Sequence, residues 1–131
     1  MGKFRQVEHA YPSRLLGWLV LVPRRHAIAL HEPRPEEFAE LGSALELTVR
    51  ALHEATGSAK EYVACHAEQP GFEHVHFHVV PRAAELPKEL QGTNSFAFLK
   101  VSQSDAVAPD SVRTFCESLR AAFRPPPAGA A

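Results

Sequence analysis

The middle of the chain reads Gly71-Phe72-Glu73-His74-Val75-His76-Phe77-His78-Val79-Val80-Pro81-Arg82, so that three histidines alternate with apolar residues. Successive side chains of a β-strand point to opposite faces of a sheet. A strand over residues 73–80 would therefore place His74, His76 and His78 on one face and the apolar side chains between them on the other. The apolar face predicts packing against a core. The histidine face predicts a polar site, because imidazole rings need hydrogen-bond partners when they are buried.

The segments on either side of the histidines predict an α+β fold with a mainly antiparallel sheet, one long helix and a C-terminal helix. The long helix begins near Pro35 with acidic residues in its first turn, and Gly57 stops it, which gives a helix over residues 35–55. A second helix begins near Asp110. Residues 83–94 are expected to form a loop or a short helix. Strands are expected over residues 3–9 (an edge strand), 15–22, 61–66, 73–80 and 96–101, with a turn over residues 68–71.

Helical spacing also predicts which side chains of the two helices are buried. In the long helix the predicted stripe consists of Phe38, Leu41, Leu45, Val49 and Leu52. In the C-terminal helix it consists of Val112, Phe115, Leu119 and Phe123. We expect a single domain over residues 1–123, followed by a disordered tail over residues 124–131 that contains three consecutive prolines.

The composition excludes several classes of protein. The chain has 14 Lys and Arg against 15 Asp and Glu, so no excess positive charge favours a stable nucleic-acid complex or an anionic membrane. The longest apolar run, residues 15–22, is too short to span a bilayer. No C-x-x-C pair is present, so we expect Cys65 and Cys116 to be free thiols in a cytoplasmic protein.

The three alternating histidines allow two kinds of chemistry. Two imidazoles at positions i and i+2 of a strand can ligate zinc, and His74 and His76 would then be joined by His66 or His26. Alternatively, a neutral imidazole can attack phosphorus and form a covalent intermediate. The ordinary pKa of histidine, near 6.5, leaves a large neutral fraction at pH 7.

The sequence His74-Val75-His76-Phe77-His78-Val79-Val80 resembles the signature of the histidine-triad (HIT) family, in which three histidines alternate with apolar residues. The earlier run Leu19-Val20-Leu21-Val22-Pro23-Arg24-Arg25-His26 resembles the apolar strand that precedes the helix in this family. The resemblance covers about residues 8–82. It implies a homodimer of α+β protomers that binds a nucleoside monophosphate moiety. It also implies that the protein cleaves dinucleoside polyphosphates, nucleoside phosphoramidates or similar esters, or transfers the nucleotidyl group, without a metal or other cofactor.

The resemblance also implies roles for single residues. His76 is expected to be the nucleophile at the α-phosphorus, His78 to contact the phosphate oxygens and His74 to orient the nucleophile by hydrogen bonding. Gly71 stands where many relatives have a hydroxyl residue. Its backbone N–H is expected either to approach the phosphate, with Gln69 and Phe72 flanking the same turn, or simply to belong to a type II turn.

Three positions depart from the pattern of the family. Trp18 replaces a histidine, and is expected either to form an aromatic wall beside the phosphate or base, or to pack in the core. No amide lies near Val63, where His66 is the available substitute. His9, or Glu8 beside it, falls close to the position that contacts the ribose. The sequence thus predicts a nucleotide hydrolase or nucleotidyl transferase, with a metal-binding module and a non-catalytic nucleotide-binding protein as the alternatives.

Overall fold

The computed structural model describes Phe4 and residues 8–123, so the predicted tail at residues 124–131 lies outside the described residues. Its centre is a four-stranded sheet in the order β1-β2-β4-β3, and every neighbouring pair is antiparallel. The α+β prediction is therefore confirmed. The strands are β1 (Glu8–His9), β2 (Leu19–Leu21), β3 (Lys60–Ala64) and β4 (Phe77–Arg82).

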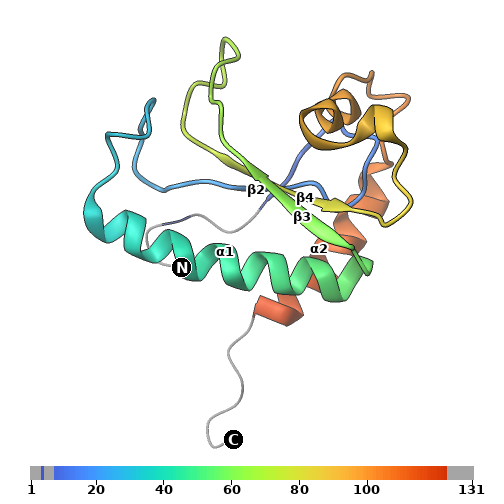
Figure 1. Cartoon of the computed structure of the whole chain (residues 1–131), viewed down its shortest axis with the longest axis horizontal. Helices are drawn as coiled ribbons and strands as arrows, with labels where there is room; N and C mark the ends of the chain where they lie inside the picture. Colours follow the sequence, from blue (N-terminus) through green and yellow to red (C-terminus); the bar gives the residue numbers. More distant parts are fainter. Residues whose placement is uncertain (1–3, 5–7, 124–131) are drawn as a thin grey trace, which may run out of the picture.

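The helices lie around this sheet (Figure 1). The long helix α1 (Pro35–Thr56) runs along one face of the sheet, and α2 (Pro109–Phe123) packs against α1. Two 3₁₀ segments, η1 (Lys88–Leu90) and η2 (Gly92–Leu99), follow β4. They lie on the other side of the sheet from α1, near the ends of the strands.

Both ends of α1 follow from local sequence. Pro35 occupies the first helical position, and the backbone N–H of Arg34 donates to Glu37 Oε1 at 2.9 Å. At the other end Gly57 adopts φ 69°, a left-handed conformation that suits glycine, and its N–H donates to the carbonyl of His53 at 2.8 Å. The predicted helix over residues 35–55 is confirmed, with one more residue at its C-terminus.

The core lies between α1 and one face of the sheet. Leu19 and Val79 of the sheet pack with Ala51 and Leu52 of α1 and with Leu119 of α2. Leu41, Leu45 and Val49 of the predicted stripe are partly buried against this core. Phe38 is the exception, because 44% of it is exposed and the neighbouring Glu37 is buried in its place. In α2, Leu119 is buried and Phe115 partly buried, whereas the side chain of Phe123 lies outside the described part.

Several predicted strands differ from those observed. The predicted edge strand over residues 3–9 is confirmed at residues 8–9, and Phe4 forms a single bridge to Pro23. The strand predicted over residues 15–22 is limited to β2, because a turn containing Gly17, at φ 101°, precedes it. The strand predicted over residues 61–66 is β3, at residues 60–64.

Two predictions were wrong in a way that matters for the site. The strand predicted over residues 73–80 begins only at Phe77 and continues through Pro81 to Arg82. The strand predicted over residues 96–101 is instead the 3₁₀ segment η2, whose Phe96 packs against aromatic rings of the sheet. Segment η2 therefore covers part of the sheet face that α1 leaves open.

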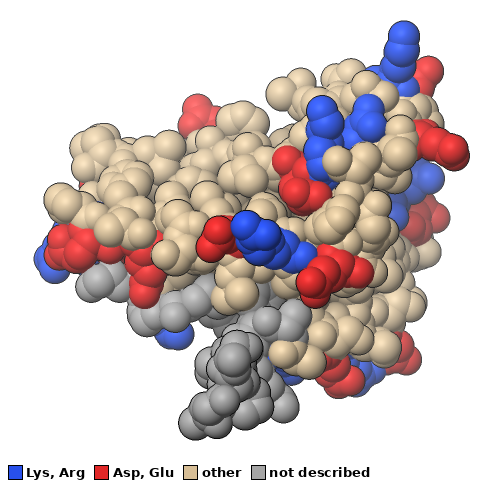
Figure 2. All heavy atoms as spheres, turned by 60° about the horizontal axis from the view of Figure 1, so that its bottom comes forward, with Lys and Arg blue, Asp and Glu red and all other residues tan. Residues whose placement is uncertain are grey.

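The surface agrees with the balanced composition. Basic and acidic side chains are interspersed on the face that holds α1 (Figure 2). Neither α1 nor α2, nor any other described helix, combines the length and apolar character needed to cross a bilayer.

Candidate active site

Strand β4 presents His78 on the side of the sheet away from α1. In the ladder, His78 lies opposite Val20 of β2 and Ala64 of β3, so these three side chains share one face. The neighbouring pair Leu19 and Val79 shares the other face and packs against α1. His78 is nevertheless buried, because aromatic side chains from outside the ladder cover it.

Trp18 and Phe96 enclose the ring of His78. The indole N–H of Trp18 donates to His78 Nδ1 at 2.9 Å, and Trp18 itself is fully buried. The ring of Phe96 meets the rings of Trp18 and His78 edge to face, with centroids 5.1 Å and 5.0 Å away. Of the two roles expected for Trp18, packing in the core is therefore the one observed. Trp18 also donates a hydrogen bond to a histidine of the triad.

The environment of His78 keeps its ring neutral. Burial, followed by unfavourable interactions with His76 and His66, lowers the pKa of His78 from 6.5 to about 4. Because Nδ1 accepts the indole N–H, the neutral ring carries its proton on Nε2. Among the described residues, His78 Nε2 has no hydrogen-bond partner. It is therefore available as a donor.

His76 lies next to His78, with ring centroids 4.8 Å apart. His76 Nδ1 lies 2.7 Å from the carbonyl oxygen of His74, so Nδ1 carries a proton and donates it. In the neutral ring this leaves the lone pair of Nε2 free.

The sulfur of Cys65 forms a hydrogen bond with the backbone of His76, and burial raises the pKa of this thiol despite that bond. Cys65 and Cys116 are both free thiols.

Neither His74 nor His76 lies on β4, which begins at Phe77, and this corrects the prediction of three rings on one strand face. The ring of His74 is held elsewhere. Its Nε2 lies 3.0 Å from the carbonyl oxygen of Pro23, and its Nδ1 lies 3.0 Å from that of Ala27. The ring also stacks on His26, with centroids 4.9 Å apart. The hydrogen bond that orients His76 comes from the backbone carbonyl of His74, whereas the ring of His74 holds the segment between Pro23 and Ala27.

The turn before the triad fits the type II description. Phe72 N–H donates to the carbonyl of Gln69 at 2.9 Å, and Gly71 adopts φ 86° as this turn requires. Gly71 N–H donates to the Glu73 carboxylate at 2.9 Å, so another anion would have to displace that carboxylate. Phe72 is 65% exposed.

His9 has a structural role in the described residues. Its Nδ1 donates to the carbonyl of Ala10 at 2.7 Å, and its Nε2 accepts the N–H of Gly17 at 2.8 Å. Burial lowers the pKa of this ring, and the hydrogen bond to Ala10 opposes the effect. Both nitrogens are therefore occupied, and the expected contact between His9 and a ribose gains no support.

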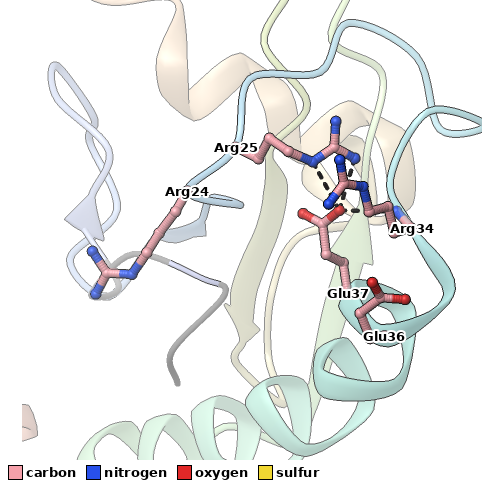
Figure 3. A pocket seen from close by; sticks show the side chains of 5 residues that line it. All are labelled: Arg24, Arg25, Arg34, Glu36 and Glu37. Carbon is pink, nitrogen blue, oxygen red and sulfur yellow. Dashed lines mark hydrogen bonds and ion pairs between the residues drawn. The ribbon is translucent and has the colours of Figure 1, made fainter.

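Two surface pockets are lined by residues other than the triad. One, of about 200 Å³, is lined by Arg24, Arg25, Arg34, Glu36 and Glu37 (Figure 3). There Arg25 donates to Glu37 Oε1 from Nη2 at 2.7 Å, while Arg24 points away from this pair. The other, of about 490 Å³, lies along α2 and is lined by Leu16, Asp110, Ser111, Thr114, Phe115 and Ser118. None of the three triad histidines lines either of these pockets.

The metal-binding alternative also gains no support. Within residues 8–123 and Phe4, no group of three or more His, Cys, Asp or Glu side chains is arranged to hold a metal ion. His26 stacks on His74, and His66 lies against Phe96 with ring centroids 5.6 Å apart. The two histidines proposed as additional zinc ligands thus contact different parts of the site.

Sequence reasoning missed Phe96, which covers His78 and contacts Trp18 and His66. The aromatic character of Phe96 was visible in the sequence. Its place beside the triad was not, because it depends on the path of η2 over the sheet.

A scan against protein-family models and a search of curated proteins found no match. Solved structures with the same fold include a hypothetical histidine triad nucleotide-binding protein from Sulfolobus tokodaii (18% identity, 92% of this chain and 77% of that chain, TM-score 0.67). A histidine triad protein from Sinorhizobium meliloti is also similar (24% identity, 81% and 74% covered, TM-score 0.66). So is one from Bradyrhizobium japonicum (23% identity, 94% and 92% covered, TM-score 0.64). This protein therefore has the fold of the histidine-triad family.

Proposed function

We propose that this protein is a nucleotide hydrolase or nucleotidyl transferase in which His76 Nε2 attacks the α-phosphorus of its substrate. The observation that carries the proposal is the 2.7 Å hydrogen bond from His76 Nδ1 to the carbonyl of His74. This bond places the ring proton on Nδ1 and leaves Nε2 as the nucleophile. It also stabilises the positive charge that grows on the ring during attack.

The reaction has two displacements. In the first, the bond between Nε2 and phosphorus forms, and the bond from phosphorus to the leaving oxygen or nitrogen breaks. The leaving group takes a proton from water. In the second, water attacks the phosphorus, the bond to Nε2 breaks, and a nucleoside monophosphate leaves while the proton from the attacking water passes to solvent. If an alcohol or phosphate replaces water, the result is nucleotidyl transfer.

His78 is the proposed donor to the phosphate oxygens. It is neutral at pH 7, and its Nε2 proton can be shared with a non-bridging oxygen as charge accumulates there. The substrate class is a dinucleoside polyphosphate, a nucleoside phosphoramidate or a similar ester. Gln69, Gly71 and Phe72 remain proposed nucleotide contacts, because their turn is exposed and directly precedes the triad.

The test is capture of the covalent intermediate. Wild-type protein is mixed with adenosine phosphoramidate or diadenosine polyphosphate, quenched, and analysed by peptide mass spectrometry. We expect an adenylyl group on His76. His76→Asn keeps an N–H that can reach the carbonyl of His74 but has no nucleophilic nitrogen, and should lower turnover by roughly 10³-fold or more.

His31→Asn is the matched control, because His31 is exposed and lies outside the proposed site. It should retain both turnover and the adduct. Wild-type turnover in His76→Asn, or an adduct on another residue, would contradict the proposal. Tight nucleotide binding without turnover on this panel of substrates would favour a non-catalytic nucleotide-binding protein.

Two further properties belong to the same proposal. The resemblance to histidine-triad proteins leads us to propose a homodimer in the cytoplasm. Light scattering coupled to size-exclusion chromatography checks the first property, since a dimer has twice the 14.4 kDa mass of the chain.

A further inference from the structure

We infer that Trp18 is a positioning residue, whose indole N–H holds His78 in the tautomer that presents Nε2–H to the phosphate of the substrate. The inference rests on the proposed function for its consequence in catalysis. Its structural part, the tautomer and the bond that fixes it, can be tested without any substrate.

The direction of the hydrogen bond is unambiguous. An indole nitrogen is a donor only, so Trp18 Nε1, at 2.9 Å, requires an unprotonated Nδ1 on His78. The two rings are nearly perpendicular, at 80°, so the bond constrains the orientation of the imidazole as well as its proton. Because Trp18 is fully buried, water does not compete for its N–H.

The surroundings of His78 reinforce this state. Its neighbours in the ladder are the apolar side chains of Val20 and Ala64, and η2 contributes the apolar ring of Phe96. The titratable groups that act on His78 among the described residues are His76 and His66. Both disfavour a positive charge on His78, so every neighbour favours the neutral form that the indole bond requires.

The chemical consequence is a phosphate donor that does not change protonation around neutral pH. A free imidazole exchanges between two neutral tautomers and becomes charged below its ordinary pKa. His78 instead keeps one proton on Nε2. Trp18 stands where the family pattern has a histidine. An indole, and not an imidazole, therefore supplies this hydrogen-bond donor to the triad.

The direct test is the tautomer of His78 in the wild-type protein. Long-range ¹H–¹⁵N spectra of protein labelled in the histidine rings distinguish a protonated from an unprotonated ring nitrogen. At pH 7 we expect His78 to show an unprotonated Nδ1 and a protonated Nε2. A protonated Nδ1, in either a neutral or a charged ring, would overturn the inference whatever the protein catalyses.

Variants at position 18 test the consequence. Trp18→Phe keeps an aromatic ring but removes the donor, so the titration midpoint of His78 should rise towards 6.5 and kcat should fall about tenfold, with a smaller change in KM. Trp18→His restores a ring N–H and should recover part of the lost kcat. Phe96→Leu is the packing control, which should lower the thermal midpoint while leaving the tautomer of His78 unchanged.

The outcomes separate this inference from the proposed function. If Trp18→Phe folds and leaves both the midpoint of His78 and kcat unchanged, Trp18 has only a packing role and the inference is wrong. If His76→Asn retains turnover, the proposed function fails, although the spectra can still establish the indole bond. An unfolded Trp18→Phe protein leaves the wild-type spectrum as the deciding measurement.

Discussion

The ring and the backbone of His74 contact different neighbours. The ring nitrogens approach the carbonyl oxygens of Pro23 and Ala27, and the backbone carbonyl accepts from His76 Nδ1. The N–H of Val75 also donates to Ala27, at 2.7 Å. The segment between Pro23 and Ala27 therefore holds residue 74 in place, and residue 74 in turn orients the proposed nucleophile.

His74→Phe should weaken both the fold and the reaction. The variant keeps an aromatic ring to stack on His26 but removes the ring nitrogens, so the free energy of unfolding should fall by about 1–2 kcal/mol. The rate of nucleotidyl transfer should fall as well, because the carbonyl of residue 74 is held less firmly. Urea denaturation and single-turnover kinetics measure the two effects. His26→Phe is the control, since the exposed ring of His26 offers stacking only; equal losses in both variants would argue against the anchoring role.

This residue also shows the limit of the sequence argument. Alternation along the chain predicted that the three histidine rings lie together, and those of His76 and His78 do. It could not predict where the ring of His74 would bind, because its partners lie 51 and 47 residues earlier in the chain. The same holds for Trp18, whose partner His78 is 60 residues away.

At the scale of elements, local sequence determines where α1 begins and ends, whereas packing determines which face of α1 is buried. Its ends were predictable because Pro35 and Gly57 act on their own turns. The buried face was predicted only in part. The pair of Arg25 and Glu37 holds Glu37 in a buried position, and the adjacent Phe38 is left 44% exposed. Spacing gives the period of a helix, but the rotation about its axis depends on the sheet beneath it.

Two truncations in α1 test this assignment of faces. Leu52 is fully buried in the main core, so Leu52→Ala should lower the free energy of unfolding by about 2–5 kcal/mol. Phe38→Ala removes a larger side chain but should cost less than about 1 kcal/mol, because much of the ring already contacts water. Urea denaturation of both variants gives the comparison. A larger loss for Phe38→Ala would mean that Phe38 is buried, as the stripe predicted from the sequence requires.

Segment η2 was the least predictable element. Phe96 and Phe98 are two residues apart, and this spacing over so short a run favours a strand as readily as a helical turn. What selects the 3₁₀ segment is tertiary packing, since the ring of Phe96 lies against Trp18, His66 and His78. The same contacts complete the enclosure of His78.

At the scale of the whole molecule, buried histidines couple stability to pH. Burial lowers the pKa values of both His9 and His78, and that of His78 falls from 6.5 to about 4. The unfolded chain binds a proton at position 78 as the pH falls through 6.5, whereas the folded protein does so only near pH 4. Between these values the unfolded state holds more protons, so stability decreases as the pH falls. Above pH 6.5 the ring is neutral in both states and the effect vanishes.

The size of this effect gives a test that needs no substrate. The pKa of His78 is about 4 in the folded protein and 6.5 in the unfolded chain. Lowering the pH from neutral to 4 should therefore reduce the free energy of unfolding by about 3 kcal/mol through His78 alone. His78→Gln removes the titration and keeps an oxygen that can accept the indole N–H of Trp18. Urea denaturation at several pH values should therefore show a shallower acid dependence in His78→Gln than in the wild type, while the exposed His31→Gln follows the wild type. Parallel curves for His78→Gln and the wild type would show that His78 titrates at its ordinary pKa in the fold, and the neutral phosphate donor proposed above would lose its basis.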